Sequence, residues 1–428
     1  LHALILWGRA ALARRNGMFA FTLWDNRERT MLVARDRFGE KPLFYHQSPR
    51  YGFAAASEMK ALLADPRISD AIDDDTLKVI KIGGYYEDGA DTLLRDIKRL
   101  EPAHCLMIND RGETVSKHRY WVPDYTRVDH ALKPNVAFDH FGYLLQESVR
   151  KRLRTDVPVG SSLSGGLDSS AIVGHIAYLR AKGISEAPQT VFSARFEEDP
   201  TLNEGPFIDS VVRFNGVTAH SVSPDPAGLM QEMMDLTWHQ EEPFLSASIY
   251  LQWCVARLAR QNDVTVLLDG QGADELLGGY QFYYKAYQQD MLDRGQTMRA
   301  LRETYKFRSR LRVAAMGYKD SKRRFNDKAA MSLKDVWGLR GKEMPAYGGN
   351  FHVGVPPIQA GYRMRRIMAE ALQYNCLPQL LRYADRNSMA FSREGRLPFL
   401  DHDLVDFTLS IPDDFLFHDG WQKYPLRK

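Results

Sequence analysis

The chain has 428 residues, a formal net charge of +3 at pH 7 and 44% hydrophobic residues. This length permits two or three domains with large buried cores, and a charge so close to balance implies no polyanionic partner. Three widely spaced cysteines (Cys105, Cys254 and Cys376) form neither a disulfide framework nor a zinc pattern, and no export or membrane segment is visible, so we expect a cytoplasmic protein without a membrane partner.

The first predicted elements are short strands. Residues 18–24, 31–34 and 43–45 are rich in strand-forming side chains and are separated by turn signals, which indicates a buried sheet. The sequence begins at Leu1, which is not Met and lies within a helical pattern. We therefore interpret the sequence as a fragment of a longer protein.

Three phrases of this region resemble the second half of a class II glutamine amidotransferase domain. They are Asn16-Gly17-Met18-Phe19-Ala20-Phe21, Ala34-Arg35-Asp36-Arg37-Phe38-Gly39-Glu40-Lys41-Pro42-Leu43 and Ala56-Ser57-Glu58-Met59-Lys60-Ala61-Leu62. The resemblance implies a partial N-terminal-nucleophile fold (αββα), with two sheets between layers of helices, and the hydrolysis of glutamine to release ammonia.

The same resemblance implies roles for three residues in binding glutamine. Asn16 and the amide of Gly17 would form an oxyanion hole, and Asp36 would bind the α-ammonium group. Taken singly, Asn16-Gly17 also fits a simple turn and Asp36 a surface ion pair. The cysteine nucleophile of such domains stands at the mature N-terminus and is absent from this sequence, so the glutaminase prediction concerns the longer parent protein.

Residues 109–134 carry Asp, Gly, Pro and charged side chains in quick succession, which predicts a link between domains at residues 1–122 and 135–428. A helix near residues 137–152 is followed by alternating strands and helices. The predicted strands are 157–163, 190–196, 218–222 and 264–268, and the predicted helices are 171–183, 204–214, 229–238 and 248–260. This alternation predicts a doubly wound parallel α/β sheet, followed from Tyr280 onward by a helical part.

The stretch Ser164-Gly165-Gly166-Leu167-Asp168-Ser169-Ser170 lies between a predicted strand and a predicted helix. Its glycines let backbone amides turn inward, and its serines supply hydroxyl donors at a positive helix N-terminus, which indicates a cradle for an anion. An acid in such a cradle needs a cation, so we predict that Asp168 binds Mg²⁺. The alternative is an ordinary loop with an N-capping serine.

This stretch lacks the lysine of a Walker A motif and resembles the pyrophosphate-binding loop (PP-loop) of the ATP pyrophosphatases. The resemblance implies that ATP is cleaved to AMP and pyrophosphate, so the reaction is adenylyl transfer.

A second glycine-rich, acidic loop spans residues 269–280, directly after the predicted strand 264–268. Because parallel strands present their carboxyl ends at one edge, this loop should face the first. Asp274 is then predicted to complete a two-carboxylate Mg²⁺ site with Asp168, and Glu275 to orient a water or a lysine. The alternative is a helix start with acidic residues in its first turn.

Together with the phrases at residues 241–244, 381–390 and 396–401, both loops are similar to the synthetase domain of glutamine-hydrolysing asparagine synthetases, over essentially the whole chain. The resemblance implies a set of ATP-binding residues: Leu163, Ser164, Gly165, Gly166, Leu167, Asp168, Ser169, Ser170, Ala194, Asp269 and Gly270. It also implies that Lys423, in Lys423-Tyr424-Pro425-Leu426-Arg427, meets the phosphates as β-aspartyl-AMP forms. An ordinary exposed lysine is the alternative for Lys423.

Gln271 is a departure, since asparagine synthetases usually carry an acidic residue there. Gln271 forms hydrogen bonds but cannot act as a base, so transfer would rely on ammonia, already a free amine, or on another residue. The expected partners are glutamine, ATP and a carboxylate, which the sequence leaves open among aspartate, a sugar acid and a peptide side chain. A homodimer also stays open.

Three rival functions remain. The first is an amide-forming cyclase of the β-lactam or lasso-peptide type with an idle amidotransferase domain, the second a PP-loop enzyme acting on tRNA, and the third a non-catalytic nucleotide sensor. The basic segment at residues 299–328 is predicted to be a solvated helical face, so no nucleic-acid partner is expected. The pattern at Lys428 stops abruptly, and we expect the parent chain to continue.

Overall fold

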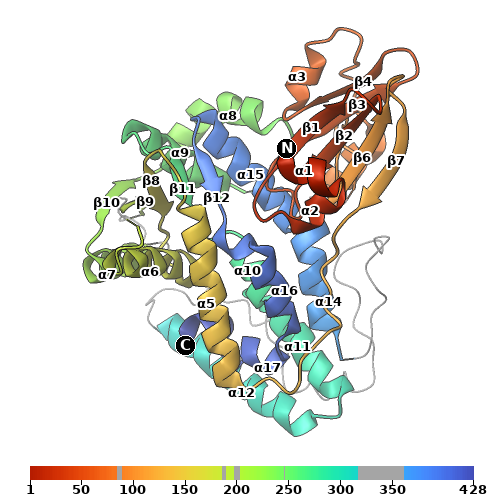
Figure 1. The fold of residues 1–428 in the computed structure, drawn as a ribbon. Helices are drawn as coiled ribbons and strands as arrows, with labels where there is room; N and C mark the ends of the chain where they lie inside the picture. The colour runs from red at the N-terminus through yellow and green to blue at the C-terminus, as the bar shows by residue number, and fades with distance from the viewer. Residues whose placement is uncertain (84–88, 186–188, 197–202, 245, 317–360) are drawn as a thin grey trace. The chain divides into compact units, whose positions relative to one another are not determined.

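The computed structural model describes residues 1–83, 89–185, 189–196, 203–244, 246–316 and 361–428. Figure 1 shows the ribbon, whose contacts divide it into two compact units. The first unit consists of Leu1–Val122, Pro226–Trp253 and Leu372–Ala390. The second consists of Pro123–Asp225, Cys254–Ala371 and Phe391–Lys428.

The first unit contains two antiparallel sheets. One has the order β1-β2-β6-β7, with β1 at Ala20–Asp25, β2 at Thr30–Arg35, β6 at His104–Asn109 and β7 at Thr114–Arg119. The other has the order β4-β3-β5, with β3 at Phe44–Ser48, β4 at Gly52–Ala56 and β5 at Lys98–Arg99. The helices are α1 (His2–Trp7), α2 (Ala10–Arg14), α3 (Met59–Leu63), α4 (Asp74–Gly83), α8 (Pro226–Gln240) and α15 (Leu377–Ala390).

Side-chain alternation along the strands explains how this unit is layered. Leu32 of β2 packs against the helical side with Leu12 of α2, whereas the next residue, Val33, packs against Tyr45 between the two sheets. On the opposite face of β3, Phe44 packs against α3. Because successive strand residues point to opposite faces, the layers run helix, sheet, sheet, helix, and the predicted αββα arrangement is confirmed.

The predicted link at residues 109–134 is wrong in its first half. Thr114–Arg119 forms β7, which pairs with β6 in the sheet. The turn signals before it belong to a hairpin, in which Gly112 has φ +78° and a Cβ would lie only 2.6 Å from the Cα of Gly52. The strand is mostly exposed and polar, so its pattern resembles that of a linker.

The second unit is built on a five-stranded sheet with the order β10-β9-β8-β11-β12, and every neighbouring pair is parallel. The strands are β8 (Val159–Ser162), β9 (Thr190–Ala194), β10 (Thr218–Val222), β11 (Val266–Leu268) and β12 (Glu394–Arg396). The chain runs outward from β8 through β9 to β10 and then continues with β11 on the other side of β8. The predicted doubly wound sheet is confirmed, and its order reverses between β8 and β11, where such sheets bind ligands.

Helices of the second unit include those that connect its strands, and they form most of the described residues after Tyr280. They are α5 (Pro134–Arg152), α6 (Leu167–Ala181), α7 (Gly205–Asn215), α10 (Ala273–Leu277), α11 (Gln281–Asp293), α12 (Thr297–Met316), α14 (Arg363–Glu370), η4 (Pro398–Leu400), α16 (His402–Ser410), α17 (Asp413–Leu416) and η5 (Tyr424–Arg427). Helices α9 (Ser248–Gln261) and η3 (Ala371–Asn375) contain boundaries between the units. The predicted basic segment starts on α12, and Lys322, Arg323 and Arg324 lie outside the described residues.

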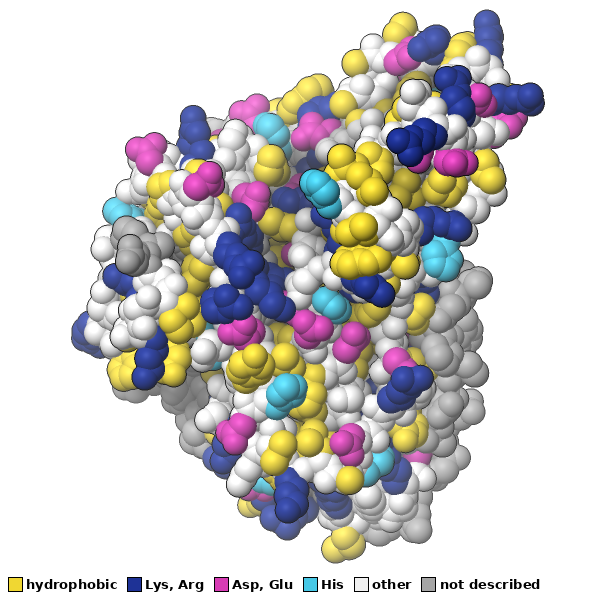
Figure 2. Space-filling view, in the orientation of Figure 1, with side chains coloured by type: hydrophobic (Ala, Val, Ile, Leu, Met, Phe, Trp, Pro, Cys, Tyr) yellow, Lys and Arg dark blue, Asp and Glu magenta, His cyan; other side chains and the backbone are white. Residues whose placement is uncertain are grey.

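Helix α5 illustrates how sequence fixes a long element here. Pro134 starts it, and Phe141, Leu145 and Val149 recur at a spacing of four residues and are buried, so one stripe faces the core. Its last turn carries Arg150, Lys151 and Arg152. Figure 2 shows dark-blue side chains gathered over this end of the helix, where positive charge offsets the negative end of the helix dipole. None of the helices in the described ranges combines the length and the apolar character that crossing a bilayer requires.

Candidate functional site

The loop after β8 is anchored to the neighbouring strand β9. The amide of Leu163 donates to the carbonyl of Phe192 (2.9 Å), and the hydroxyl of Ser193 donates to the carbonyl of Leu163 (2.7 Å). Ala194, another predicted ATP-binding residue, is the last residue of β9. The predicted PP-loop therefore leaves the sheet at its carboxyl edge, beside the end of β9.

Hydrogen bonds within the PP-loop fix its path into α6. Gly165 has φ +83°, a left-handed value that glycine adopts without steric cost. The amide of Gly166 donates to the Ser164 hydroxyl (3.3 Å), the amide of Ser164 donates to the Ser169 hydroxyl (3.2 Å), and the Ser170 hydroxyl donates to the Gly166 carbonyl (2.7 Å). Helix α6 then begins at Leu167, and its first amides have no intrahelical acceptors. A glycine turn that ends on a helix N-terminus is suited to hold an anion.

The second acidic loop lies against the first, as the sequence predicts. It begins after β11, and the amide of Asp269 donates to the carbonyl of Arg396 on β12 (3.0 Å). A Cβ at Gly270 would lie 3.1 Å from the Cβ of Asp168 and 3.2 Å from the amide nitrogen of Ser169. Glycine at this position therefore permits the close approach of the two loops.

Lys423 joins the acidic residues of the two loops. Its ammonium nitrogen lies 2.6 Å from Oδ2 of Asp168 and 2.7 Å from Oδ1 of Asp274. The exposed fractions of the three side chains are 14% for Lys423, 18% for Asp168 and 35% for Asp274. Residues that the sequence places more than a hundred positions apart thus form one charged group, which we call the carboxylate–lysine triad.

The backbone around Lys423 is held in an uncommon conformation. Lys423 has φ +51° and ψ +40°, a left-handed geometry that costs a non-glycine residue about 1 kcal/mol. The preceding side chain, Gln422, donates to the carbonyls of Gly278 (2.7 Å) and Tyr280 (2.9 Å). At the residue between them, Gly279, a Cβ would overlap the Asp274 carboxylate and the Lys423 stem. Gln422 and Gly279 together let Lys423 reach the acidic loops.

Burial and charge act in opposite directions within the triad. Burial raises the pKa of Asp168, although the neighbouring Lys423 ammonium opposes this shift. Burial by itself would lower the pKa of Lys423, but Asp168 and Asp274 outweigh it and raise that pKa above its usual value. The triad therefore holds its charges by mutual attraction in a partly desolvated position.

One oxygen of the triad is unsatisfied. Oδ1 of Asp168 is buried and has no hydrogen-bond partner in the described part of the chain. A buried carboxylate oxygen without a donor is costly unless a ligand completes it. Mg²⁺ binds through one or two carboxylates together with phosphate oxygens and waters, so Asp168 and Asp274 fit the donor set that this ion requires.

The other predicted residues of the second loop differ in their surroundings. Glu275 is buried, and its carboxylate accepts a hydrogen bond from the Tyr280 hydroxyl (2.7 Å). Burial raises the pKa of Asp269, whereas hydrogen bonds from Ser162 and from the amides of Gly270 and Gln271 oppose the shift. The structure thus gives Asp269 a role in shaping the turn, while the catalytic roles of Gln271 and Glu275 stay predictions.

In the first unit, Asp36 organises the turn after β2. Its carboxylate accepts hydrogen bonds from the backbone amides of Phe19 (3.3 Å), Phe38 (3.1 Å), Glu40 (2.9 Å) and Lys41 (2.9 Å). Burial raises the pKa of Asp36, and the amides of Lys41, Glu40 and Phe19 oppose the shift together with the nearby Arg35 guanidinium. A carboxylate held by four amides is fixed in position, which a recognition role for a substrate ammonium would also need.

Asn16 and Gly17 lie just before β1 and are exposed. Gly17 has φ +114°, and open space lies where its Cβ would stand. Two residues after Gly17, the amide of Phe19 donates to the Asp36 carboxylate (3.3 Å), and the carbonyl of Phe19 accepts a hydrogen bond from the amide of Asp36 (2.8 Å). The three predicted glutamine-binding residues therefore belong to one corner of the first unit, and their roles in binding glutamine stay predictions.

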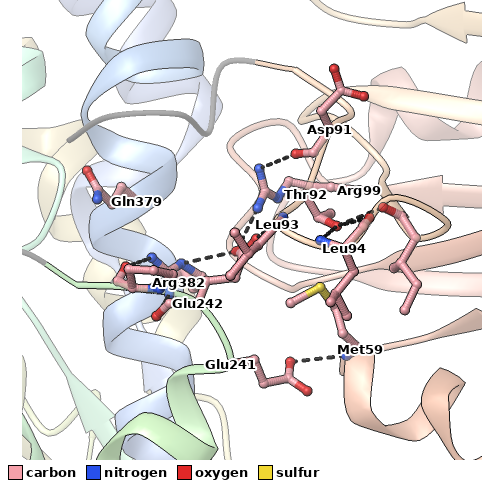
Figure 3. Close-up of polar contacts among 12 residues, drawn as sticks. Met59, Asp91, Thr92, Leu93, Leu94, Arg99, Glu241, Glu242, Gln379 and Arg382 are labelled. Atoms are coloured by element: carbon pink, nitrogen blue, oxygen red, sulfur yellow. Dashed lines mark hydrogen bonds and ion pairs between the residues drawn. The ribbon is translucent and has the colours of Figure 1, made fainter. Parts of the chain in front are cut away.

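The sequence did not predict a buried group of charges in the first unit, which Figure 3 shows. Glu242 lies 2.7 Å from Nη2 of Arg99 and 3.7 Å from Nε of Arg382, and the exposed fractions of these side chains are 0%, 3% and 5%. The other oxygen of Glu242 accepts a hydrogen bond from the amide of Leu93 (3.3 Å). We call these three charged residues the buried arginine cluster.

The neighbouring Glu241 connects the same elements. Its carboxylate accepts hydrogen bonds from the amides of Met59 (3.1 Å) and Lys60 (2.7 Å) at the start of α3, and it lies 2.6 Å from Nη2 of Arg386 on α15. A helix start leaves such amides in need of acceptors. In the sequence, two adjacent acids before Pro243 are the only sign of these ion pairs. Their spacing does not identify the arginines and amides that they contact, because these partners lie far away in the sequence.

Comparisons with known proteins assign the two parts of the chain to two family models. The asparagine synthase family model matches residues 140–428, and the glutamine amidotransferase domain model matches residues 1–121. Asparagine synthetase [glutamine-hydrolyzing] 3 of Bacillus subtilis (strain 168) is 30% identical over 439 residues, which cover 100% of this chain and 66% of the relative. The chain thus spans just under two thirds of that relative's length.

Two further similarities extend over less of the chain. Amidase chry2 of Gibberella zeae is 28% identical over 290 residues, which cover 64% of this chain and 41% of the relative. Among solved structures, NMN synthetase from Francisella tularensis aligns with a TM-score of 0.21 and 15% identity, over 35% of this chain and 59% of that protein.

Proposed function

We propose, from the premise that this chain belongs to the asparagine synthase family, that its second unit activates a carboxylate with ATP and converts it to an amide. One observation carries the proposal. Where the strand order reverses, between β8 and β11, the two loops present Asp168 and Asp274 to a single lysine. Paired carboxylates beside a glycine-rich anion cradle suit a nucleotide with its metal.

The proposed reaction has two steps. A carboxylate oxygen of the substrate attacks the α-phosphorus of ATP, the bond from this phosphorus to the bridging oxygen breaks, and pyrophosphate leaves. The nitrogen of ammonia then attacks the acyl carbon, the bond from this carbon to the AMP oxygen breaks, and the nitrogen loses a proton. Adenylation is needed because a carboxylate is a poor electrophile, whereas AMP is a good leaving group.

Each part of the site has a task in this proposal. The amides at the start of α6 and the Ser164, Ser169 and Ser170 hydroxyls hold the pyrophosphate, and Ala194, Asp269 and Gly270 flank the nucleoside. Asp168 and Asp274 hold Mg²⁺, which when bound neutralises charge on the phosphate oxygens. Lys423 supplies a compact positive charge to the phosphates as negative charge shifts toward the leaving group.

We assign the supply of ammonia to residues 1–121 of the first unit, which match the glutamine amidotransferase domain model. Asn16 and Gly17 would stabilise the oxyanion of glutamine hydrolysis, and Asp36 would bind the α-ammonium group. Hydrolysis also requires a nucleophile. We propose aspartate as the acceptor, the product being asparagine, and the cytoplasm as the location.

A second candidate is amide formation on another carboxylate, with the glutaminase unit idle or put to another use. Gln271 favours it, because this neutral residue stands in the loop where asparagine synthetases usually carry an acid. A relative that is called an amidase also matches 64% of the chain. Under this candidate the acceptor is a sugar acid, a peptide side chain or a substrate that cyclises.

Exchange of radiolabelled pyrophosphate into ATP tests both candidates, because only the adenylation step has to occur. The full-length protein would be screened with aspartate, sugar acids and peptides that carry side-chain carboxylates. We expect aspartate to support exchange. Exchange with a different carboxylate alone would select the second candidate, and no exchange with any of them would overturn the proposal.

A further inference from the structure

We propose that the ammonium group of Lys423 occupies the position that a divalent cation takes when nucleotide binds, so that lysine and metal exclude each other between Asp168 and Asp274. The inference rests on the proposed function only in that these two carboxylates bind the cation. The inference adds that the Lys423 ammonium takes the place of the metal ion while no nucleotide is bound.

The geometry of the triad carries the first step. One nitrogen contacts Oδ2 of Asp168 and Oδ1 of Asp274 at 2.6 and 2.7 Å, so it lies between the oxygens that would have to approach a bridging cation. Like charges repel strongly in a partly buried position. A divalent ion therefore cannot enter while the ammonium remains.

The balance of charge carries the second step. Two carboxylates face one ammonium, and a buried oxygen of Asp168 stays without a hydrogen-bond partner in the described residues. The positive charge of Arg427 also lowers the pKa of Asp168. Oδ1 of Asp168 nevertheless has no hydrogen-bond partner in the described residues. Lysine is thus an adequate occupant that a doubly charged ion with phosphate oxygens can replace.

The backbone carries the third step, because it lets the side chain leave without unfolding the segment. Gln422 fixes the chain through the carbonyls of Gly278 and Tyr280, while the four-carbon stem of Lys423 can rotate. Gly279 leaves the space that the stem occupies beside Asp274. The lysine can therefore turn from the carboxylates to the phosphates while its backbone stays in place.

A clear order of binding follows. Without nucleotide, a metal would have to displace Lys423 from both carboxylates, and no phosphate would be present to receive its ammonium. With nucleotide, the phosphates provide that anion and also provide ligands for the metal. The native protein should therefore bind a divalent ion weakly on its own, and removal of the ammonium should open the site.

Mn²⁺ is a suitable probe because its binding can be followed by electron paramagnetic resonance without any nucleotide or carboxylate. In the full-length protein we expect Lys423→Met to bind one Mn²⁺ at least tenfold more tightly than the native protein. The double variant Lys423→Met/Asp274→Asn should lose this gain. Lys98→Met serves as a matched control, since Lys98 pairs with the single carboxylate of Asp91 at 2.9 Å. The Lys98→Met variant should bind Mn²⁺ with the affinity of the native protein.

Two further variants keep the test decisive. Lys423→Gln should reproduce the gain if Lys423→Met fails to fold, as judged by circular dichroism. Lys423→Arg retains the positive charge and should bind Mn²⁺ as weakly as the native protein. Equal affinities in the native protein and in the folded Met or Gln variant would overturn the inference, as would an Arg variant as tight as these. Pyrophosphate exchange is measured separately, so failure here would leave the proposed function standing.

Discussion

The buried arginine cluster and the carboxylate–lysine triad have nearly the same shortest contacts, 2.7 Å from Glu242 to Arg99 and 2.6 Å from Asp168 to Lys423. They differ in how completely each charge is satisfied. In the cluster, Glu242 also meets Arg382 and the Leu93 amide, and all three charged side chains are at most 5% exposed. In the triad, exposure reaches 35% and a buried oxygen of Asp168 has no partner in the described residues.

This contrast separates two uses of buried charge. A closed cluster gains nothing from a ligand, and losing one member leaves an uncompensated charge in the interior. An open triad costs stability as it stands and is completed when a cation and phosphates bind. Satisfaction of the polar groups, more than the length of the ion pair, therefore distinguishes the structural site from the candidate active site.

The largest effect should come from opening the closed cluster. Glu242→Gln leaves Arg99 and Arg382 without their carboxylate, and we expect the first unit to lose about 3–5 kcal/mol of stability. Urea denaturation followed by tryptophan fluorescence measures this loss, since most of the tryptophans belong to that unit. Asp75→Asn removes the exposed ion pair with Lys78 and should leave the midpoint unchanged. Equal midpoints for both variants would contradict the structural role of the cluster.

Removing a charge from the open triad should affect chemistry instead of stability. We expect Asp168→Asn to lower pyrophosphate exchange by about 100- to 1,000-fold, because the nucleotide and its cation lose a ligand where charge develops. The urea midpoint should change little, since Lys423 keeps its contact with Asp274. Asp139→Asn, at an exposed position of α5 in the same unit, is the control and should exchange normally. Undiminished exchange in Asp168→Asn would remove Asp168 from the active site.

Asp290 provides an intermediate case, a buried carboxylate held by backbone amides. It accepts hydrogen bonds from the amides of Arg363 and Met364 (both 2.9 Å) at the start of α14. Burial and the nearby Asp413 raise its pKa to about 7, although the two amides and Arg294 oppose the shift. The two amides and Arg294 together therefore do not offset the burial of this carboxylate.

A raised pKa means that the folded state binds a proton which the unfolded state has released above about pH 4. Asp290 should therefore make the protein less stable as pH rises from 5 to 6.5, by about 2 kcal/mol. In Asp290→Asn this part of the pH dependence should disappear. Denaturation curves at several pH values measure the slope, and identical slopes in both proteins would show that Asp290 is already ionised at pH 5.

Local sequence signals predicted the elements that carry each loop. Alternating apolar runs and glycine turns identified the strands before Ser164 and Asp269, and the topology of parallel sheets then predicted that the loops meet. The position of Lys423 between two carboxylates was beyond such reasoning, because it depends on a left-handed residue and on the room that Gly279 leaves. Likewise, the partners of Glu242 come from segments distant in sequence, and the spacing of hydrophobic residues does not predict such pairs.

The smallest effect should follow from filling the space beside the triad. In Gly279→Ala the new Cβ overlaps the Asp274 carboxylate and the Lys423 stem, so the lysine must withdraw while both charges remain in the chain. We expect pyrophosphate exchange to fall by about tenfold, which is the cost of a modest displacement in a packed site.

Gly174→Ala is the matched control, because Gly174 lies inside α6 with open space where its Cβ would stand. It should exchange normally and gain about 0.5–1 kcal/mol of stability from higher helix propensity. If Gly279→Ala also exchanged normally, adenylation would not require a precise position of the Lys423 side chain. The charge of the lysine would then matter more than its position. A loss as large as that in Asp168→Asn would instead mean that Gly279 shapes the nucleotide site itself.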